Sequence, residues 1–339
     1  MPNRVYAMKP VFRPLTTIIL ASLLFISICS LPGCAPAAPS TVRIGYLLGD
    51  LHQLPFFVAQ DKGFFAAEGL NVEVVGPFEA GPAEMDALAA NQVDMGYVGV
   101  APAVMAAARK VPLSIVSGVN LEGSGLVTGK DINGLAELKS RKIATPAPGS
   151  IQYVMLGMLL AGNNLSFSDV ELFPGTVKPP DMPQSLQTGR IDGYFVWEPF
   201  VAKSVVGGYG KVLVASKDIW PGHPCCVIVT AGDFGRLNNG TVESVIRAHR
   251  RAVDFIATNP AEAKAIAARW TKLDPAVIDD AFQRVKYTYS LNRDDVRKFV
   301  SEIISLGESG AIKPIITASD VPDLDKFVET IVDTKYLQR

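Results

Sequence analysis

The strongest candidates for binding chemistry are backbone amides at a strand-to-helix junction between residues 81 and 104. Here a helix, a strand and a helix follow one another almost without connecting residues, and Gly81-Pro82 opens the first helix, a position that suits proline. Small residues around Gly99 leave the first amides of the next helix accessible. Helix N-termini carry partial positive charge and bind small anions. The stretch therefore predicts ligand contacts at Gly81, Pro82, Tyr97, Gly99 and Ala101.

The same pattern returns later in the chain. Asn91-Gln92-Val93-Asp94 is echoed by Gly189-Arg190-Ile191-Asp192, and a helix-opening proline follows each strand, Pro102 in the first copy and Pro199 in the second. The last aspartates of the two copies lie 98 residues apart (192 − 94). Two such units at this distance predict two lobes that each bring a strand end to one shared cleft. The repeat leaves other arrangements open, because any two βα units look alike.

Polar and aromatic side chains near these junctions complete the predicted site. Ser150 suits the N-cap of a helix. Aromatic rings at the strand ends would stack on a ligand or else pack in the core, and Glu198 would alternatively cap a helix or pair with a base. The nearby cations are Lys130 and Lys178, so an anion, a zwitterion and a neutral heterocycle all stay open as ligands. The further candidate contacts are Asp50, His52, Gly149, Ser150, Gln152, Trp197 and Glu198.

The cysteines do not show the spacing of a metal site. The sequence has four, Cys29, Cys34, Cys225 and Cys226, and three histidines. A metal site needs three or four spaced ligands, so no metal and no cofactor is expected. Cys225 and Cys226 are predicted to be two small apolar residues on a strand, with a vicinal disulfide as the alternative in an oxidising compartment. The sequence shows no nucleophile motif, and no catalytic residue is expected.

Composition and charge narrow the class of protein. The chain has 339 residues, of which 48% are hydrophobic and 19% charged, as is usual for globular proteins. Its formal net charge of −1 gives no reason to expect nucleic acid as a partner. The length predicts two domains or one two-lobed unit. Nothing in the sequence requires more than a monomer.

The first 33 residues differ from the rest. Basic residues precede a mostly apolar run at residues 15–31, which is the pattern of a secretory signal. The next residues, Leu31-Pro32-Gly33-Cys34, resemble a bacterial lipobox. A cleaved signal without lipid, an uncleaved anchor, and a start at Met8 instead of Met1 stay open. The resemblance implies an extracytoplasmic protein, lipid-anchored to the cell membrane on its periplasmic side or outer face, with a signal peptide at 1–33, lipid on Cys34 and a lipidated tether at 34–41.

Strands and helices alternate from Val42 onward, which predicts an α/β fold with mainly parallel sheets. A second alternating set begins near Gly123, and the chain returns to the first set at Cys226. Helices from Val242 onward form a tail that is predicted to pack on the first set and to carry no chemistry. The predicted domains are lobe I (42–121 and 224–339) and lobe II (122–223), joined by hinge segments near 119–123 and 221–225.

Several segments resemble one family of transport proteins. Ile44-Gly45-Tyr46, residues 58–73, residues 81–102 and Trp197-Glu198-Pro199 are similar to the solute-binding lipoproteins for nitrate, sulfonate, taurine and thiamine-pyrimidine precursors that serve ABC importers. The resemblance implies a type II periplasmic-binding-protein fold, with two α/β lobes, a hinge, a ligand cleft and a helical C-terminal tail. It also implies a non-catalytic receptor that captures a small sulfonate, nitrate, taurine-like or related solute by hinge closure. The partners would be an ABC permease and its ATPase.

Two other functions stay open within this resemblance. A sensory binding protein would present its ligand to a membrane receptor. Thiamine-pyrimidine synthases share the fold, are enzymes, and use a Cys-rich segment to which Cys225-Cys226 is similar. The few histidines and the secretion signal argue against the synthase.

Overall fold

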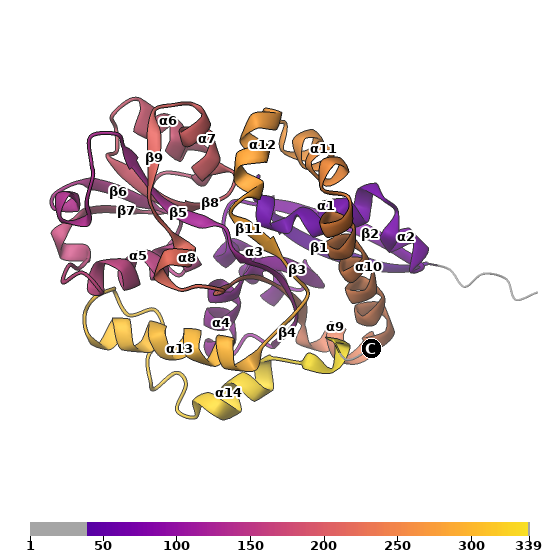
Figure 1. Cartoon of the computed structure of the whole chain (residues 1–339). Helices are drawn as coiled ribbons and strands as arrows, with labels where there is room; N and C mark the ends of the chain where they lie inside the picture. The colour runs from indigo at the N-terminus through magenta and orange to yellow at the C-terminus, as the bar shows by residue number, and fades with distance from the viewer. Residues whose placement is uncertain (1–38, 338–339) are drawn as a thin grey trace, which may run out of the picture. The chain divides into compact units, whose positions relative to one another are not determined.

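The strands gather into two sheets in the computed structural model, which describes residues 39–337 (Figure 1). In the larger sheet β1 runs parallel to β2 and β3, whereas β10 runs antiparallel to β3 and β4. The alternation of strands and helices in the sequence predicted the parallel strands. The antiparallel β10 comes from a much later part of the chain. The strands of this sheet, in spatial order, are β11 (Val285–Tyr287), β4 (Leu113–Glu122), β10 (Pro224–Ala231), β3 (Met95–Gly99), β1 (Ser40–Leu47) and β2 (Leu70–Phe78).

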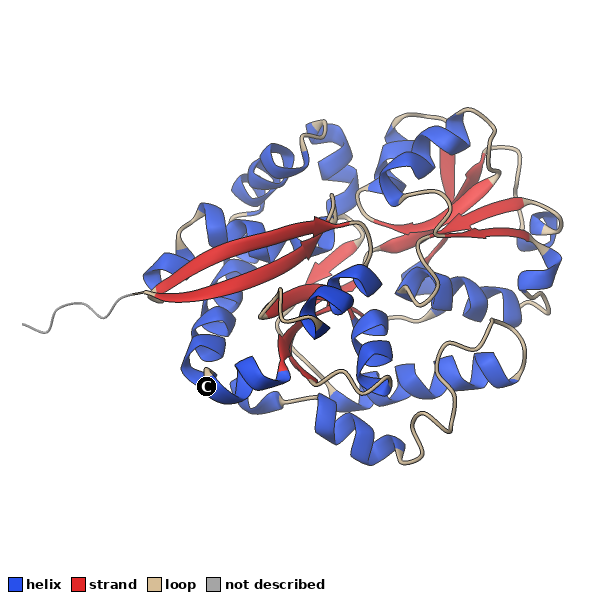
Figure 2. Ribbon diagram, turned by 180° about the vertical axis from the view of Figure 1, so that it is seen from behind, coloured by secondary structure: helices blue, strands red, loops and turns tan. Residues whose placement is uncertain are grey.

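The smaller sheet is built entirely from the middle of the chain. Figure 2 shows its strands as a group separate from those of the larger sheet. β6 runs parallel to β7 and β8, and β5 runs antiparallel to β8 and β9. The spatial order is β7 (Glu171–Pro174), β6 (Lys142–Thr145), β8 (Gly193–Trp197), β5 (Ser124–Gly129) and β9 (Gly210–Ala215).

The chain passes between the sheets twice, once from β4 to β5 and once between β9 and β10. Gly123 alone separates β4 from β5, and its φ of +84° is one that glycine adopts without strain. Its carbonyl oxygen accepts from Glu198 N at 2.9 Å and lies 2.7 Å from His52 Nε2. Groups next to both sheets therefore hold this crossing in place. The division into two mobile lobes stays a prediction.

The helices follow the predicted starts closely. Gly81-Pro82 opens α3 and Ser150 caps α5, as predicted, and Pro275 opens α12. α4 begins at Val100 instead of Pro102, because the extended Gly99 is its N-cap. Proline is tolerated at residue 102, since the N–H groups of the first turn have no acceptor within the helix. The α-helices of the described residues are α1 (Leu54–Asp61), α2 (Phe64–Ala67), α3 (Gly81–Ala89), α4 (Val100–Ala108), α5 (Ile151–Ala161), α6 (Met182–Gln187), α7 (Phe200–Val206), α8 (Ser216–Ile219), α9 (Gly232–Leu237), α10 (Asn239–Thr258), α11 (Pro260–Thr271), α12 (Pro275–Phe282), α13 (Arg293–Glu308) and α14 (Leu324–Ile331).

The C-terminal helices reach further than predicted. α10 packs against α1 and α2, but α12 lies beside α7 and α13 contacts α5 (Figure 1). Val296, Phe299, Val300 and Ile303 recur at helical spacing in α13 and are all buried, so this helix has an apolar face to cover. The prediction that the tail packs on the first lobe is therefore wrong in its extent, because the tail contacts the helices of both sheets.

The predicted signal peptide, Cys34 and most of the predicted tether lie outside the described residues. β1 begins at Ser40 and not at Val42, and Ser40 stands opposite Leu70 of β2. The last two residues of the predicted tether therefore belong to the sheet. Among residues 39–337, no helix combines the length and the apolar character needed to cross a bilayer.

Glu84 is a buried carboxyl in the first turn of α3. Within the described part of the chain neither of its oxygens has a hydrogen-bond partner. Gly96 makes room for it, since a Cβ at that position would lie 2.4 Å from Glu84 Oε1. Burial, and then the charge of Asp50, raise the pKa of Glu84 well above its ordinary value of 4.5. The folded protein therefore keeps a proton that the unfolded chain releases.

Replacing Glu84 by glutamine should remove a pH-dependent loss of stability. Above pH 4.5 the unfolded state binds fewer protons than the folded state, so wild-type stability falls as pH rises. The stability of Glu84→Gln relative to wild type should grow by about 1.4 kcal/mol per pH unit until Glu84 ionises in the fold. Urea unfolding across a pH series measures this, with the exposed Glu308→Gln as control. Parallel profiles for Glu84→Gln and wild type would contradict the assignment.

Candidate functional site

A narrow cavity lies where the two sheets meet. Only ≈ 20 Å³ of it can hold the centre of a water molecule, which is room for about one water. Its wall combines strand ends, helix starts and the 3₁₀ turn η1 (Leu51–Gln53). The lining residues are Leu47, Asp50, His52, Ala80, Gly81, Gly99, Pro102, Ser150, Ile151, Gln152, Trp197, Cys225 and Cys226.

Three helices begin at the cavity wall. α3 contributes Gly81, α4 its N-cap Gly99, and α5 the residues from Ser150 to Gln152. Ser150 Oγ accepts from Tyr153 N at 3.2 Å, which confirms Ser150 as the predicted N-cap. First-turn amides have no acceptor within their own helix and carry partial positive charge. Three such N-termini at one cavity favour a ligand group with negative charge.

Asp50 and Gln53 shape the turn on one side of the cavity. Asp50 Oδ1 accepts from His52 N at 2.9 Å, and Gln53 Nε2 donates to the Tyr97 carbonyl at 2.6 Å. Leu47 N donates to Gln53 Oε1 at 2.8 Å. Burial raises the pKa of Asp50 to about 6, although His52 opposes the shift. The cavity thus has one acidic side chain that keeps its proton more readily than usual.

Trp197 lines the cavity and has a donor without a hydrogen-bond partner among the described residues. Its side chain is buried at the end of β8 and lines the cavity. Within residues 39–337 its Nε1–H has no hydrogen-bond partner, and leaving a buried donor unpaired costs about 1–3 kcal/mol. Gln152 on the same wall donates to Ser124 Oγ at 2.9 Å. A ligand oxygen in the cavity would relieve the indole of that cost.

Cys225 and Cys226 also line the cavity, next to His52. Their Sγ atoms lie 3.3 Å and 3.8 Å from His52 Nδ1, and both are free thiols. Burial opposes the charged form of Cys225, but Cys226 and His52 outweigh it and lower the pKa of this thiol well below its ordinary value. Burial likewise opposes the charge on His52, and the charges of Cys225 and Asp50 raise its pKa to about 10. The sequence did not predict this cluster, in which His52 and Cys225 lie 173 residues apart.

The cavity brings together most, but not all, of the predicted ligand contacts. Those that line it are Asp50, His52, Gly81, Gly99, Ser150, Gln152 and Trp197. Those that do not are Pro82, Tyr97, Ala101, Gly149 and Glu198. Lining residues that were not predicted are Leu47, Ala80, Pro102, Ile151, Cys225 and Cys226.

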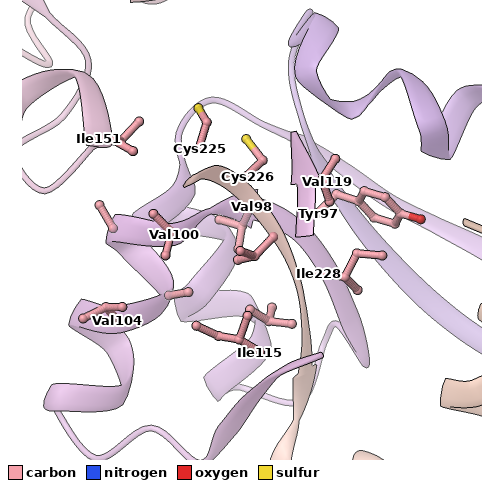
Figure 3. Packing of buried hydrophobic residues seen from close by; sticks show 14 of the residues in the cluster. Tyr97, Val98, Val100, Val104, Ile115, Val119, Ile151, Cys225, Cys226 and Ile228 are labelled. Atoms are coloured by element: carbon pink, nitrogen blue, oxygen red, sulfur yellow. The ribbon is translucent and has the colours of Figure 1, made fainter. Parts of the chain in front are cut away.

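Tyr97 is a core residue. It is fully buried, its ring lies 5.3 Å from that of Phe56 in α1, and its hydroxyl lies 3.4 Å from His249 Nδ1 in α10. Figure 3 shows the ring extending away from Cys225 and Cys226. The prediction that Tyr97 contacts ligand gives way to core packing, because the ring fills the space between the sheet and these two helices.

Glu198 has a structural role and does not line the cavity. It is fully buried, caps α7 by accepting from Ala202 N at 3.0 Å, and forms an ion pair with Arg284. Both alternatives considered for Glu198, a helix cap and a partner for a base, are confirmed. Burial raises the pKa of Glu198, and Arg284 opposes the rise. Arg284 follows α12 in the tail that was expected to carry no chemistry.

Comparison of the sequence with models of known protein families identifies the family of this chain. The model of the NMT1-like family matches residues 35–271, which is more than half of the chain. The chain belongs to the NMT1-like family. Residues 44–46, 58–73, 81–102 and 197–199, which carry the resemblance seen in the sequence, all lie within the matched range.

Three named binding proteins are similar to the chain, one in sequence and two in structure. The taurine-binding periplasmic protein of Escherichia coli is 28% identical over 210 residues, covering 61% of this chain and 64% of that protein. The periplasmic aliphatic sulphonate-binding protein of Escherichia coli has a TM-score of 0.71 at 21% identity, covering 88% of this chain and 100% of that one. The periplasmic nitrate-binding protein of Synechocystis PCC 6803 has a TM-score of 0.75 at 18% identity, covering 88% of each. The chain therefore has the periplasmic-binding-protein fold, as predicted.

Proposed function

We propose that the protein is the extracytoplasmic solute-binding component of an ABC importer. It captures one small solute in the cavity between the sheets and delivers it to a permease that is driven by an ATPase. The observation that supports this proposal is the meeting of three helix N-termini at one cavity, which is also lined by Trp197, a residue with an unpartnered Nε1–H. The protein acts as a receptor and not as an enzyme, in line with its binding-protein relatives.

The solute carries a small oxyanion group of the sulfonate class. Among the described residues that line the cavity none is Lys or Arg, so helix amides and the indole N–H would hold the anion. The Asp50 carboxyl on the same wall would accept from a donor on the solute. A taurine-like zwitterion satisfies both ends. The named relatives for taurine, sulphonate and nitrate support this class.

Binding works by closure of two lobes. The cavity volume of ≈ 20 Å³ is too small for a solute of several atoms to enter without separation of its walls. The two crossings between the sheets, at Gly123 and between β9 and β10, would act as the hinge between lobe I (42–121 and 224–339) and lobe II (122–223). Solute that touches both walls shifts the population towards the closed form. The protein acts as a monomer, held to the membrane by lipid on Cys34 after removal of residues 1–33.

Small-angle scattering tests the closure. Addition of a tightly bound solute should reduce the radius of gyration of the purified protein. An unchanged radius with a saturating, tight solute would remove the closure mechanism while leaving solute binding itself in place.

Trp197→Phe should weaken solute binding. The variant keeps the aromatic packing and loses the Nε1–H, and one hydrogen bond is worth about 0.5–1.5 kcal/mol. The dissociation constant measured by calorimetry should rise by up to about tenfold. Trp220→Phe, a buried tryptophan that packs on Phe299 outside the cavity, is the matched control and should keep wild-type affinity. Equal losses in both variants would show that the indole N–H is not a ligand donor.

A further inference from the structure

Two thiols and one imidazole meet on one wall of the cavity because of a β-bulge. Neighbouring residues on a strand normally point to opposite faces. In β10, however, Pro224 stands opposite Leu121 and Cys226 opposite Asn120 of β4, so Cys225 is an extra residue. Such a bulge redirects a side chain. Figure 3 shows the Cys225 and Cys226 side chains directed to the same side of the strand, where both reach His52.

The imidazole is held with one nitrogen facing the thiols. His52 Nε2 lies 2.7 Å from the Gly123 carbonyl oxygen, which can only accept a hydrogen bond. Nε2 therefore carries a hydrogen, and Nδ1 is the atom that faces Cys225 and Cys226. Metal-binding histidines are commonly fixed in this way, with a carbonyl or carboxylate on the nitrogen that does not bind the metal.

The distances fit a tetrahedral ion. Typical zinc–sulfur and zinc–nitrogen bonds at a tetrahedral angle place the sulfur and nitrogen atoms about 3.6 Å apart, and the observed values are 3.3 Å and 3.8 Å. Donor atoms of His52, Cys225 and Cys226 all lie within 4.8 Å of one another, and the three residues are buried. Asp50 lies beside these three residues, with Oδ1 3.5 Å from His52 Nδ1 and Oδ2 4.0 Å from Cys226 Sγ, but it is not one of the three residues whose donor atoms lie within 4.8 Å of one another.

We propose that His52, Cys225 and Cys226 bind a thiophilic metal ion, Zn²⁺, with a neutral donor in the cavity, such as water, at the remaining position. Soft thiolate ligands select ions of this kind. Two thiolates and a neutral imidazole balance the charge of Zn²⁺, and burial of a net charge is costly. A singly charged ion such as Cu⁺ would leave the cluster negative. Binding releases two protons into solution, one from the Cys226 thiol and one that His52 Nδ1 and the Cys225 thiol share.

The metal site goes beyond the proposed solute-binding role and does not depend on it. Both sites share the cavity wall, so the ion's remaining position faces the space that the solute would enter. Zinc binding is measured without any solute, and solute binding is measured separately. Failure of one proposal is therefore distinguishable from failure of the other.

Competition between the reduced, metal-free protein and a chromophoric chelator for Zn²⁺ tests the site. We expect one high-affinity Zn²⁺ per chain. Cys225→Ser and Cys226→Ser should each weaken binding by more than the ~10–100-fold that loss of an outer hydrogen-bond partner costs. His249→Gln, which changes a buried histidine outside the cavity, is the matched control and should bind as wild type does.

Two results would overturn the assignment. One is the absence of stoichiometric Zn²⁺ binding by the reduced protein. The other is wild-type affinity in the Cys225→Ser/Cys226→Ser double variant, which still contains Cys29 and Cys34. If the double variant does not fold, Co²⁺ added to a Cys29→Ser/Cys34→Ser background decides. A thiolate-to-cobalt charge-transfer band with a tetrahedral spectrum supports the site, and an octahedral spectrum without that band overturns it.

Discussion

Replacing Arg284 by methionine should lower the free energy of unfolding by about 3–5 kcal/mol at neutral pH. Glu198 is fully buried, and Arg284 is its ion-pair partner. Methionine keeps the apolar stem of Arg284 but leaves the buried carboxylate without a counter-charge. Because Glu198 follows β8 of the smaller sheet and Arg284 precedes β11 of the larger one, the pair also joins the two sheets. Urea unfolding at constant pH measures the loss.

Two controls separate the buried charge from other effects. Arg284→Met combined with Glu198→Gln should recover most of the loss, because the charge that remains without its partner, Asp280, is 24% exposed and not fully buried. Lys178→Met breaks the pair with Glu79, whose side chains are 57% and 61% exposed, and should change stability by less than about 1 kcal/mol. A loss below that value for Arg284→Met would show that the pair does not hold the sheets together.

Gly123→Ala should be the most damaging small substitution at the crossing between the sheets. The φ of +84° strains any residue with a Cβ, and that Cβ would lie 2.4 Å from His52 Nε2 and 3.0 Å from Val285 Cγ2. Backbone strain and overpacking together should cost about 2–5 kcal/mol. Displacement of His52 should also weaken solute binding in the cavity. Unfolding and calorimetry on the same preparation measure both effects.

Gly189→Ala separates strain from overlap. Gly189 also has a positive φ, +69°, but a Cβ there meets no atom within 4 Å. Its substitution should cost about 1–2 kcal/mol from the backbone alone and should leave solute affinity unchanged. Equal losses of stability in Gly123→Ala and Gly189→Ala would mean that overlap between the new Cβ at residue 123 and His52 adds no cost to the backbone strain.

The sequence predicted those parts of the fold that depend on local signals. Pro82 at a helix start, Ser150 as an N-cap and the alternation from Val42 onward all act within a few residues of the chain. The same local signals placed Gly81, Gly99 and Ser150 at the cavity. The family resemblance then supplied the two-sheet arrangement, which the structure and the comparisons confirm.

The parts that the sequence did not predict depend on contacts between distant residues. Cys225 and Cys226 looked like two neighbours on a strand, and only the bulge in β10 turns both towards His52, 173 residues away from Cys225. Arg284 lies 86 residues from Glu198, so nothing local marks it as the partner. The choice between core and ligand for Tyr97 depended on α10, which packs behind the ring.

A thermal-shift screen of the purified protein against small solutes would test directly whether the cavity binds a solute. It compares alkanesulfonates, taurine, nitrate, bicarbonate and hydroxymethylpyrimidine compounds, with mass spectrometry for solute that purifies with the protein. A solute at a hundredfold excess over its dissociation constant should stabilise the fold by about 2.7 kcal/mol. We expect stabilisation by a sulfonate-class oxyanion, and a smaller shift in Trp197→Phe. Stabilisation only by a heterocycle would contradict the oxyanion assignment, and no stabilisation with no retained solute would contradict solute binding in this cavity.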